Sequence, residues 1–386
     1  MRREDSLSVR GPVACVVGAR PNFVKIAPIL RALASMSTPL SALLVHTGQH
    51  YDPGMSERVF EELSLPKPDI NLEVGSGSHA VQTAEVMRRF EPVIDEHSPS
   101  CVLVVGDVNS TLACSLVAAK KRVPVVHVEA GLRSFDRMMP EEINRVLTDQ
   151  IADLHYTTER SANANLMREG IEHSRIRFVG NVMIDSLLAN RQAAPAPRET
   201  LERARLSTAS LDDARGYGVV TLHRPSNVDH PQTLATLLAV LCEAAERLPL
   251  IFAIHPRTRA NIESFGLARR LASARVALLP PLGYLEMLGL MSAASLVLTD
   301  SGGVQEETTA LGVPCLTVRA NTERPITVEQ GTNTLVGTDA RAILHGVDEI
   351  VAGGGKRGRV PELWDGRAAE RIAADLGQWL AHRQAQ

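Results

Sequence analysis

The amino-acid sequence predicts an α/β protein built from two doubly wound parallel sheets. Short, wholly apolar runs alternate with longer periodic segments along the 386 residues, a pattern typical of parallel strands that are buried on both faces and joined by helices. Polar residues and glycines follow the ends of these runs, where open parallel sheets bind their ligands. The alternation stops near residue 191 and restarts at residue 218, and a chain of this length usually forms two domains.

In the first half, apolar runs predict six strands, and the periodic segments between them predict helices. The strands are expected at residues 13–17, 42–46, 101–105, 123–128, 154–157 and 177–179. The helices are expected at residues 23–33, at residues 78–97 and from about residue 110 to residue 121.

The second half repeats this arrangement after a connecting region. Residues 191–216 are rich in Ala, Pro, Arg and Asp and contain no apolar run, so we expect an interdomain connection with some helix. Strands are then expected at residues 218–222, 250–254, 276–279, 296–298 and 314–318, and a final helix at residues 364–383. Two such halves facing each other would place their strand ends around one interdomain cleft.

Composition excludes several classes of protein. The net charge is −3 and aromatic residues make up 3% of the chain, which argues against nucleic-acid binding. The five cysteines lie far apart without a C-x-x-C pair, so we expect buried free thiols and no metal site. No apolar run approaches the length of a membrane span or of a signal-peptide core, and we therefore expect a cytoplasmic protein without a membrane partner.

Carboxylates follow the ends of two neighbouring strands in the first half. Asp107 and Glu129 are 22 positions apart, the length of one strand–helix–strand unit, so they should lie at the same edge if those strands pair. Glu141 follows at the start of a predicted helix, behind Pro140. Three converging carboxylates would repel one another and raise at least one pKa, which suits proton transfer. A purely structural interpretation is that Asp107 caps a helix and that Glu141 and Glu142 are ordinary acids of a first helical turn. We accept this structural role for Glu142 alone.

The second half contains a candidate anion site. A strand passes into Ser301-Gly302-Gly303 and then into a helix, and the free N–H groups of such a helix start can bind a diphosphate. Glu307 lies about one turn further, where a carboxylate could hold a ribose diol. The same pattern also fits an ordinary strand–helix turn that happens to contain glycine.

Basic residues stand at or just beyond strand ends in both halves. Each one alone is more often a surface or capping residue, but several of them facing one cleft would neutralise a diphosphate. No G-x-G-x-x-G follows the first strand and no Walker loop occurs, so the fingerprints of NAD and ATP sites are missing. The basic residues concerned are Arg20, Lys25, His223, His255 and Arg324.

With these residues in view, the chain resembles bacterial UDP-N-acetylglucosamine 2-epimerases of the non-hydrolysing type, over about residues 13–380. The motifs that carry the resemblance are Gly18-Ala19-Arg20-Pro21, His127-Val128-Glu129-Ala130-Gly131-Leu132-Arg133, Pro140-Glu141-Glu142, Thr299-Asp300-Ser301-Gly302-Gly303-Val304-Gln305-Glu306-Glu307 and Glu323-Arg324-Pro325.

The resemblance implies a glycosyltransferase-B-like fold with two Rossmann-like domains around a cleft, and a homodimer. An N-terminal domain at residues 1–190 would carry the catalytic carboxylates, and residues 191–365 would bind UDP. A last helix at residues 366–386 would cross back to the first domain. The substrate would be a UDP-sugar, no metal, NAD, flavin or other cofactor is implied, and the product would feed surface polysaccharides.

The resemblance also implies roles for individual residues. The reaction would be anti elimination of UDP to 2-acetamidoglucal, followed by re-addition of UDP with the configuration at C2 inverted, and which carboxylate is the base stays open. The residues matching catalytic positions are Asp107, Glu129, Glu141 and His223. The residues matching substrate contacts are Arg20, Lys25, His255, Ser301, Gly302, Gly303, Glu307 and Arg324.

Three segments depart from the family pattern. The loop at residues 134–139 is short, Gln49-His50-Tyr51-Asp52 stands where many members read Gln-His-Arg-Glu and bind a regulatory UDP-GlcNAc, and Arg224-Pro225-Ser226-Asn227 follows His223. These departures leave open both allosteric activation by the substrate and a related diacetamido sugar as substrate. The sequence is also compatible with a hydrolysing 2-epimerase that releases ManNAc and UDP, with a glycosyltransferase and with a nucleotide-sugar-binding regulatory protein.

Overall fold

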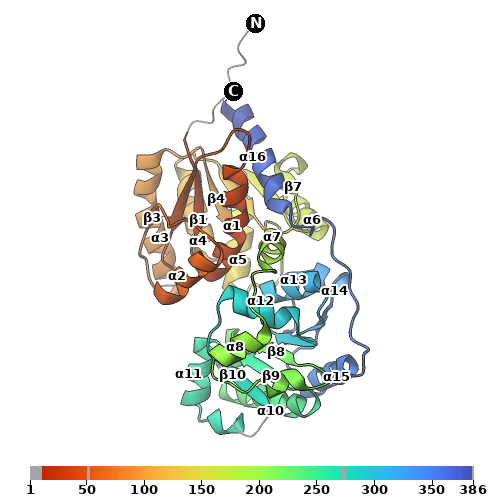
Figure 1. The fold of residues 1–386 in the computed structure, drawn as a ribbon. Helices are drawn as coiled ribbons and strands as arrows, with labels where there is room; N and C mark the ends of the chain where they lie inside the picture. The colour runs from red at the N-terminus through yellow and green to blue at the C-terminus, as the bar shows by residue number, and fades with distance from the viewer. Residues whose placement is uncertain (1–10, 50–52, 272–274, 385–386) are drawn as a thin grey trace. The chain divides into compact units, whose positions relative to one another are not determined.

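The computed structural model describes residues 11–49, 53–271 and 275–384, and the chain divides into two compact units. Unit 1 comprises Met1–Leu188 and Glu362–Gln386, and unit 2 comprises Ala189–Pro361. Each unit contains one parallel sheet with helices packed on its faces (Figure 1). The predicted α/β class with two doubly wound sheets is therefore confirmed.

The sheet of unit 1 has seven parallel strands in the order β3-β2-β1-β4-β5-β6-β7. The order reverses between β1 and β4, which is the switch point at which doubly wound sheets place their ligands. β4 pairs with β5, with Val105 opposite Val128, so the pairing that would bring Asp107 and Glu129 to one edge is present. The strands are β1 (Val13–Val17), β2 (Ala42–His46), β3 (Ile70–Asn71), β4 (Cys101–Val105), β5 (Val125–Val128), β6 (Leu154–Thr157) and β7 (Ile176–Phe178).

Helices cover both faces of this sheet because alternate strand residues point to opposite sides. Val86 and Phe90 of α3 and Cys114 and Val117 of α4 pack on the face that carries Val104. The helices are α1 (Arg20–Ala34), α2 (Pro53–Glu62), α3 (His79–His97), α4 (Asn109–Lys120), α5 (Pro140–Ile151), α6 (Arg160–Arg168), α7 (Val182–Asn190) and α16 (Ala368–Gln384).

The last helix, α16, packs within unit 1 beside α1 (Figure 1). The buried carboxylate of Asp185 accepts hydrogen bonds from the N–H groups of Ala368 (3.1 Å) and Ala369 (2.7 Å) at the start of this helix. The Tyr156 hydroxyl donates to the Asp375 carboxylate at 2.9 Å. These contacts fix a segment that is distant in sequence against β6 and α7.

The sheet of unit 2 has six parallel strands in the order β10-β9-β8-β11-β12-β13. This is the Rossmann order, and it reverses between β8 and β11. The strands are β8 (Gly218–Thr221), β9 (Leu250–Ala253), β10 (Val276–Leu279), β11 (Leu296–Thr299), β12 (Cys315–Thr317) and β13 (Asn333–Leu335).

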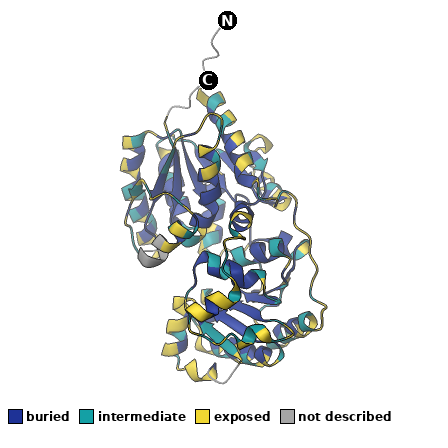
Figure 2. Cartoon of the chain, in the orientation of Figure 1, coloured by how far each residue is buried: buried dark blue, intermediate teal, exposed yellow. Residues whose placement is uncertain are grey.

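Helices α10 and α15 cover one face of this sheet, and α8 and α12 pack on the other. The four central strands, β9, β8, β11 and β12, are almost wholly buried, and the outer helix faces are exposed (Figure 2). The helices are α8 (Pro197–Arg203), α9 (Pro225–Val228), α10 (Pro231–Arg247), α11 (Pro256–Ser264), α12 (Tyr284–Ser292), α13 (Gly302–Leu311), α14 (Pro325–Glu329) and α15 (Ala340–Val351).

Several elements differ from the expectation. Residues 191–216 do not form a separate connection but belong to unit 2, where α8 buries Leu201 completely in the core. The strands β3 and β13 have two and three residues, of which one in each is Asn, so neither produces a recognisable apolar run. Helix α1 begins at Arg20 rather than residue 23, because Pro21 fits the first helical turn. No helix within the described ranges is long and apolar enough to cross a membrane.

Candidate active site

Asp107 and Glu129 lie at the carboxyl edge of the unit 1 sheet, beyond the paired strands β4 and β5. A side chain added to Gly106 would come within 3.1 Å of the Lys25 Nζ atom and 3.9 Å of the Glu129 Oε1 atom. The turn that carries Asp107 therefore passes directly beside the Glu129 side chain. The sequence prediction that these two carboxylates share one edge of the sheet is correct.

Glu129 is buried and paired with Lys25 from α1. The Lys25 ammonium lies 2.8 Å from Oε1 and 2.7 Å from Oε2 of Glu129, and both side chains are at most 5% exposed. Glu129 also has a φ of +71°, a left-handed conformation that costs a non-glycine residue about 1–3 kcal/mol and persists only where the surroundings enforce it. The N–H groups of Glu129 and Ala130 both donate to the Tyr156 carbonyl at 3.0 Å, which fixes this backbone.

Asp107 is paired with Arg145 from α5. The Asn144 side chain donates to the Asp107 carbonyl at 2.9 Å, so two consecutive residues of α5 hold the turn that carries Asp107. Glu141 is half-buried one helical turn before Arg145, on the same helix face by the i, i+4 spacing. Glu141 therefore lies on the helix that contacts Asp107.

Two of these carboxylates have a cationic partner that was not predicted from the sequence. The expectation was that Asp107, Glu129 and Glu141 repel one another and that this repulsion raises at least one pKa. Instead, Lys25 and Arg145 supply one positive charge each to Glu129 and Asp107. The partners were missed because they lie 104 and 38 positions away in the sequence.

The ordinary role assigned to Glu142 is wrong. Its carboxylate is 2% exposed and accepts hydrogen bonds from the N–H groups of Ser134 and Phe135, both at 2.9 Å, while Arg145 lies 2.7 Å away. Burial works against ionisation of Glu142, but the Ser134 N–H and the Arg145 guanidinium outweigh it and lower the pKa. Glu142 therefore fixes the short loop at residues 134–139, which exposes 71% of Phe135.

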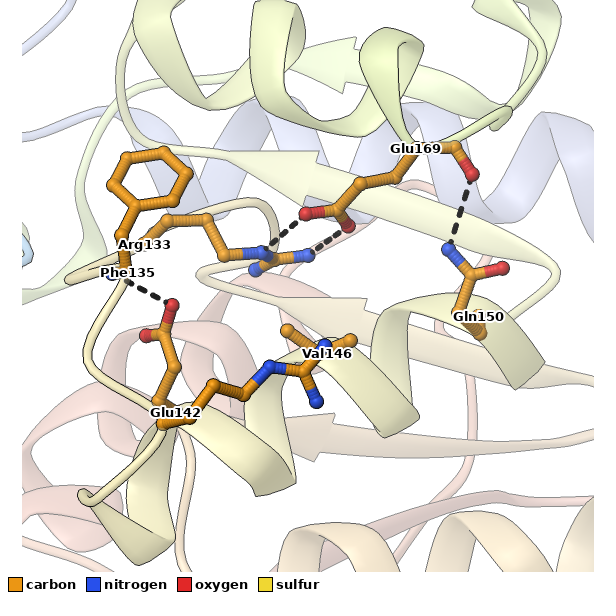
Figure 3. A pocket seen from close by; sticks show the side chains of 7 residues that line it. Arg133, Phe135, Glu142, Val146, Gln150 and Glu169 are labelled. Carbon is orange, nitrogen blue, oxygen red and sulfur yellow. Dashed lines mark hydrogen bonds and ion pairs between the residues drawn. The ribbon is translucent and has the colours of Figure 1, made fainter.

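A cavity of about 380 Å³ opens beside this loop. Figure 3 shows Glu142 reaching the loop backbone at Phe135, and Arg133 paired with Glu169 across the cavity. Asp107, Glu129 and Glu141 are not among the lining residues, which are Arg133, Phe135, Arg137, Glu142, Val146, Gln150 and Glu169.

In unit 2, His223 follows β8 and Asp300 follows the neighbouring strand β11. Asp300 is fully buried and lies 2.9 Å from Nδ1 of His223, so only Nε2 of that imidazole can act on a ligand. Burial disfavours ionisation of Asp300, but the hydrogen bond and charge of His223 lower its pKa. The Arg224 N–H (2.9 Å) and the Asn227 amide (3.0 Å) also donate to Asp300. The segment that departs from the family pattern therefore helps to orient His223.

The predicted anion site is built around the start of α13, with Ser301 at the N-cap position. The Arg324 guanidinium is buried, with Nη1 2.6 Å from Glu323 and Nε 2.9 Å from Glu306. A side chain added to Gly302 would lie 2.6 Å from Arg324 Nη1, so glycine is required here for Arg324 to approach the helix.

The remaining predicted residues lie near these groups within their own units. The ring centroid of His255 is 5.6 Å from that of His223, Gly303 belongs to the first turn of α13, and Glu307 is buried further along the same helix. In unit 1, Arg20 is the first residue of α1, directly after β1. His50, Tyr51 and Asp52, in the segment that departs from the family's regulatory pattern, lie outside the described residues.

Sequence reasoning missed Arg145 and Asp300. Arg145 lies four positions after Glu141 and Asp300 directly follows a buried strand, and both spacings could have singled them out. Among the described residues, no group of three or more His, Cys, Asp or Glu side chains is arranged to hold a metal ion.

Comparisons with known proteins identify the family to which the chain belongs. The family model described as UDP-N-acetylglucosamine 2-epimerase matches residues 34–377. The chain is 43% identical to the UDP-N-acetylglucosamine 2-epimerase of Methanocaldococcus jannaschii, covering 94% of this chain and 98% of the relative. It is 44% identical to the UDP-2,3-diacetamido-2,3-dideoxy-D-glucuronate 2-epimerase of Pseudomonas aeruginosa, covering 86% of this chain and 90% of the relative.

A solved structure shows the same fold. The crystal structure of Methanocaldococcus jannaschii UDP-GlcNAc 2-epimerase in complex with UDP-GlcNAc and UDP matches with a TM-score of 0.86 at 42% identity, covering 95% of this chain and 99% of that one. The chain belongs to the UDP-N-acetylglucosamine 2-epimerase family.

Proposed function

We propose that this protein is a non-hydrolysing 2-epimerase that interconverts UDP-GlcNAc and UDP-ManNAc. The observation that supports it best is the pair of carboxylates Asp107 and Glu129 at the carboxyl edge of the unit 1 sheet, with Glu129 held in a left-handed conformation beside Lys25. Folding alone gains nothing from a strained, buried glutamate. Such strain is typical of sites where a side chain must be aimed at a reacting atom.

In the proposed reaction, a carboxylate of unit 1 removes the proton at C2 of the sugar while the C1–O bond to UDP breaks. The electron pair of the C–H bond forms the C1=C2 double bond of 2-acetamidoglucal, and the pair of the C1–O bond leaves with UDP. UDP then adds back to C1, and a proton is delivered to C2 on the opposite face. The carboxylates proposed for these transfers are Asp107, Glu129 and Glu141, and general acid–base groups of this kind each contribute roughly 10²–10⁴ in rate.

Unit 2 is proposed to bind UDP. The N–H groups at the start of α13, from Ser301 to Gly303, and the Arg324 guanidinium would bind the diphosphate, since a helix N-terminus and a guanidinium both favour phosphate. His223, oriented by Asp300, would donate from Nε2 to the phosphate or to the departing oxygen. Glu307 would bind the ribose, and His255, Arg20 and Lys25 are proposed as further contacts to the nucleotide sugar.

A second candidate substrate is a UDP-2,3-diacetamido-2,3-dideoxy uronic acid. It is favoured by the 44% identity to the Pseudomonas aeruginosa enzyme that is named for such a sugar. The same C2 chemistry would apply, because the acetamido group at C2 is common to both sugars. The two substrates differ at C3 and C6, so the choice between them depends on pocket contacts rather than on the carboxylates.

We further propose a cytoplasmic homodimer that supplies precursors of surface polysaccharides. The free thiols at Cys15, Cys101, Cys114 and Cys315 are buried, and free cysteines persist in a reducing compartment. Light scattering of the purified protein tests the oligomeric state, and a monomer at micromolar concentration would contradict the dimer.

The proposed function is tested by incubating the protein with UDP-GlcNAc, and separately with the diacetamido uronic acid, in heavy water. Proton NMR should show loss of the C2 proton signal and appearance of the C2 epimer, with Glu129→Gln as the inactive control. Absence of deuterium at C2 with both sugars refutes epimerisation. Stoichiometric release of UDP with free ManNAc would identify a hydrolysing enzyme instead, and binding without exchange would identify a regulatory protein.

A further inference from the structure

A fully buried histidine connects the two turns that carry Asp107 and Glu129. His127, within β5, lies with Nε2 2.8 Å from the Gly106 carbonyl and Nδ1 2.6 Å from the Asp149 Oδ1 atom. Because a carbonyl can only accept, Nε2 donates to Gly106. Asp149 is itself 0% exposed, and so the histidine, the carboxylate and the carbonyl are all removed from water.

The second oxygen of Asp149 binds the other turn. Asp149 Oδ2 accepts from the Gly131 N–H at 3.0 Å and lies 2.7 Å from Arg133. The Asp149 carbonyl in turn accepts from Nε2 of His155 at 2.7 Å. A continuous chain of hydrogen bonds therefore runs from the carbonyl before Asp107, through His127 and Asp149, to the N–H two residues after Glu129.

The backbone at both ends of this chain is in the left-handed region. Gly106 has φ +70°, Gly131 has φ +79°, and Glu129 between them has φ +71°. The two glycines adopt this region readily, whereas the conformation of Glu129 needs external restraint. A side chain on Gly131 would meet the Ala162 carbonyl at 2.6 Å, so this turn is also packed tightly against α6.

The charge of Asp149 fits this arrangement. Burial opposes its ionisation, but the charge of His127, its hydrogen bond and the charge of Arg133 outweigh burial and lower the pKa to about 2. An ionised carboxylate accepts on both oxygens, which matches the donors that surround Asp149. Asparagine in place of Asp149 would turn its NH₂ group toward one of these donors, and two donors cannot form a hydrogen bond with each other.

We infer that His127 and Asp149 are positioning residues that set the placement of Asp107 relative to Glu129 for C2 proton transfer. This inference rests on the proposed epimerase function and assigns the pair to that same site. Neither residue acts on the substrate directly, because both are enclosed beneath the turns. Misplacement of a reacting group by about 1 Å can reduce the rate roughly 10²-fold, and that is the scale of loss expected.

The test compares Asp149→Asn with Asp185→Asn. Asp185 is also a buried aspartate of unit 1 with backbone N–H partners, but those partners lie at the start of α16. Asp149→Asn should lower kcat for UDP-GlcNAc epimerisation by roughly 10²-fold with KM changed less than about threefold. Asp185→Asn should lower the unfolding temperature yet leave kcat near that of the wild type.

Two results would overturn the inference. One is an Asp149→Asn enzyme with kcat within about threefold of the wild type. The other is a loss of kcat in both variants that follows their loss of thermal stability. If Asp149→Asn does not fold, His127→Asn replaces it in the comparison, since it removes the Nε2 bond to Gly106 and keeps a donor near Asp149.

Amide hydrogen exchange separates this inference from the proposed function. Peptides covering residues 104–108 and 128–132 should exchange faster in Asp149→Asn than in the wild type, and not in Asp185→Asn. Unchanged exchange refutes the restraint of the two turns even if the wild type proves to act on another sugar. If the wild type shows no C2 exchange but Asp149→Asn shows faster amide exchange, the proposed epimerase activity is refuted, whereas the restraint of the two turns by His127 and Asp149 is supported.

Discussion

Replacing Lys25 by methionine removes the ammonium that pairs with Glu129 while keeping a side chain of similar length. Both partners are buried, with side chains 5% and 2% exposed, so water screens their interaction little. Removing one member of a buried ion pair typically costs about 3–5 kcal/mol, because it leaves a buried charge uncompensated. We therefore expect Lys25→Met to lower the free energy of unfolding of unit 1 by about this amount.

The double variant Lys25→Met/Glu129→Gln measures the coupling between the two charges. Replacing a buried ion pair by neutral groups of similar size is often close to neutral in stability, so the second substitution should recover most of the loss. The coupling free energy from the double-mutant cycle of the wild type, the two single variants and the double variant should be about 2–3 kcal/mol. For a domain of roughly 150–250 residues, 1 kcal/mol corresponds to about 2–4 °C in Tm, which predicts a fall of roughly 6–20 °C for the single variant.

Differential scanning calorimetry is the suitable assay, because it resolves the transitions of two units that need not unfold together. Lys121→Met is the matched control: the same substitution removes a partly exposed lysine that pairs with Glu91 and Asp95 at the surface, and surface pairs contribute little. If Lys25→Met lowers the transition temperature no more than Lys121→Met does, or if the cycle shows no coupling, the buried pair does not exist in solution and the site geometry that depends on it is wrong.

Three further predictions concern the site and its electrostatics. Asp107→Asn should reduce kcat by roughly 10²–10⁴ with unchanged UDP affinity by isothermal calorimetry, and a wild-type rate would remove Asp107 from the site. Asp300→Asn should weaken UDP binding by roughly 10–100-fold, the value of a hydrogen bond to a charged group, because His223 loses its orienting partner; unchanged affinity would contradict that role. The pKa of Asp149 falls from about 3.9 when unfolded to about 2 when folded, so its stabilisation is fully present above about pH 4 and is lost as the pH falls toward 2. Urea unfolding between these pH values should therefore show a smaller loss of stability on acidification in Asp149→Asn than in the wild type, and equal slopes would contradict the lowered pKa.

The sequence predicted the sheets and the strand ends well, because buried parallel strands leave an unambiguous apolar run. The positions of β1, β2, β4, β6 and β10 match the predicted ranges residue for residue. The pairing of β4 with β5, and hence the shared edge of Asp107 and Glu129, followed from the length of one strand–helix–strand unit. The features that could be predicted are those that depend on the local pattern of apolar residues and on the topology of parallel sheets.

The ion pair between Lys25 and Glu129 and the buried hydrogen-bond chain could not be predicted, because they depend on side-chain direction. Lys25 faces Glu129 only because α1 turns that residue toward the sheet edge, and spacing along the chain gives no such information. Glu142 was interpreted as an ordinary first-turn acid because its position in the first turn of α5 is favourable for any acid. Its burial depends on how the loop at residues 134–139 folds back over the helix start, which is a tertiary effect.

The paired charges change the reason for expecting catalysis. Uncompensated carboxylates would have been hard to explain in a pure binding protein, but Lys25 and Arg145 cancel two of the negative charges, and repulsion no longer distinguishes an enzyme from a binder. The left-handed backbone at Glu129 still distinguishes the two, because it costs stability and such strain is typical of functional sites. The pairing also matters for an anionic substrate: three unpaired carboxylates would repel a UDP-sugar, whereas the two cations offset part of that negative charge while one carboxylate accepts a proton.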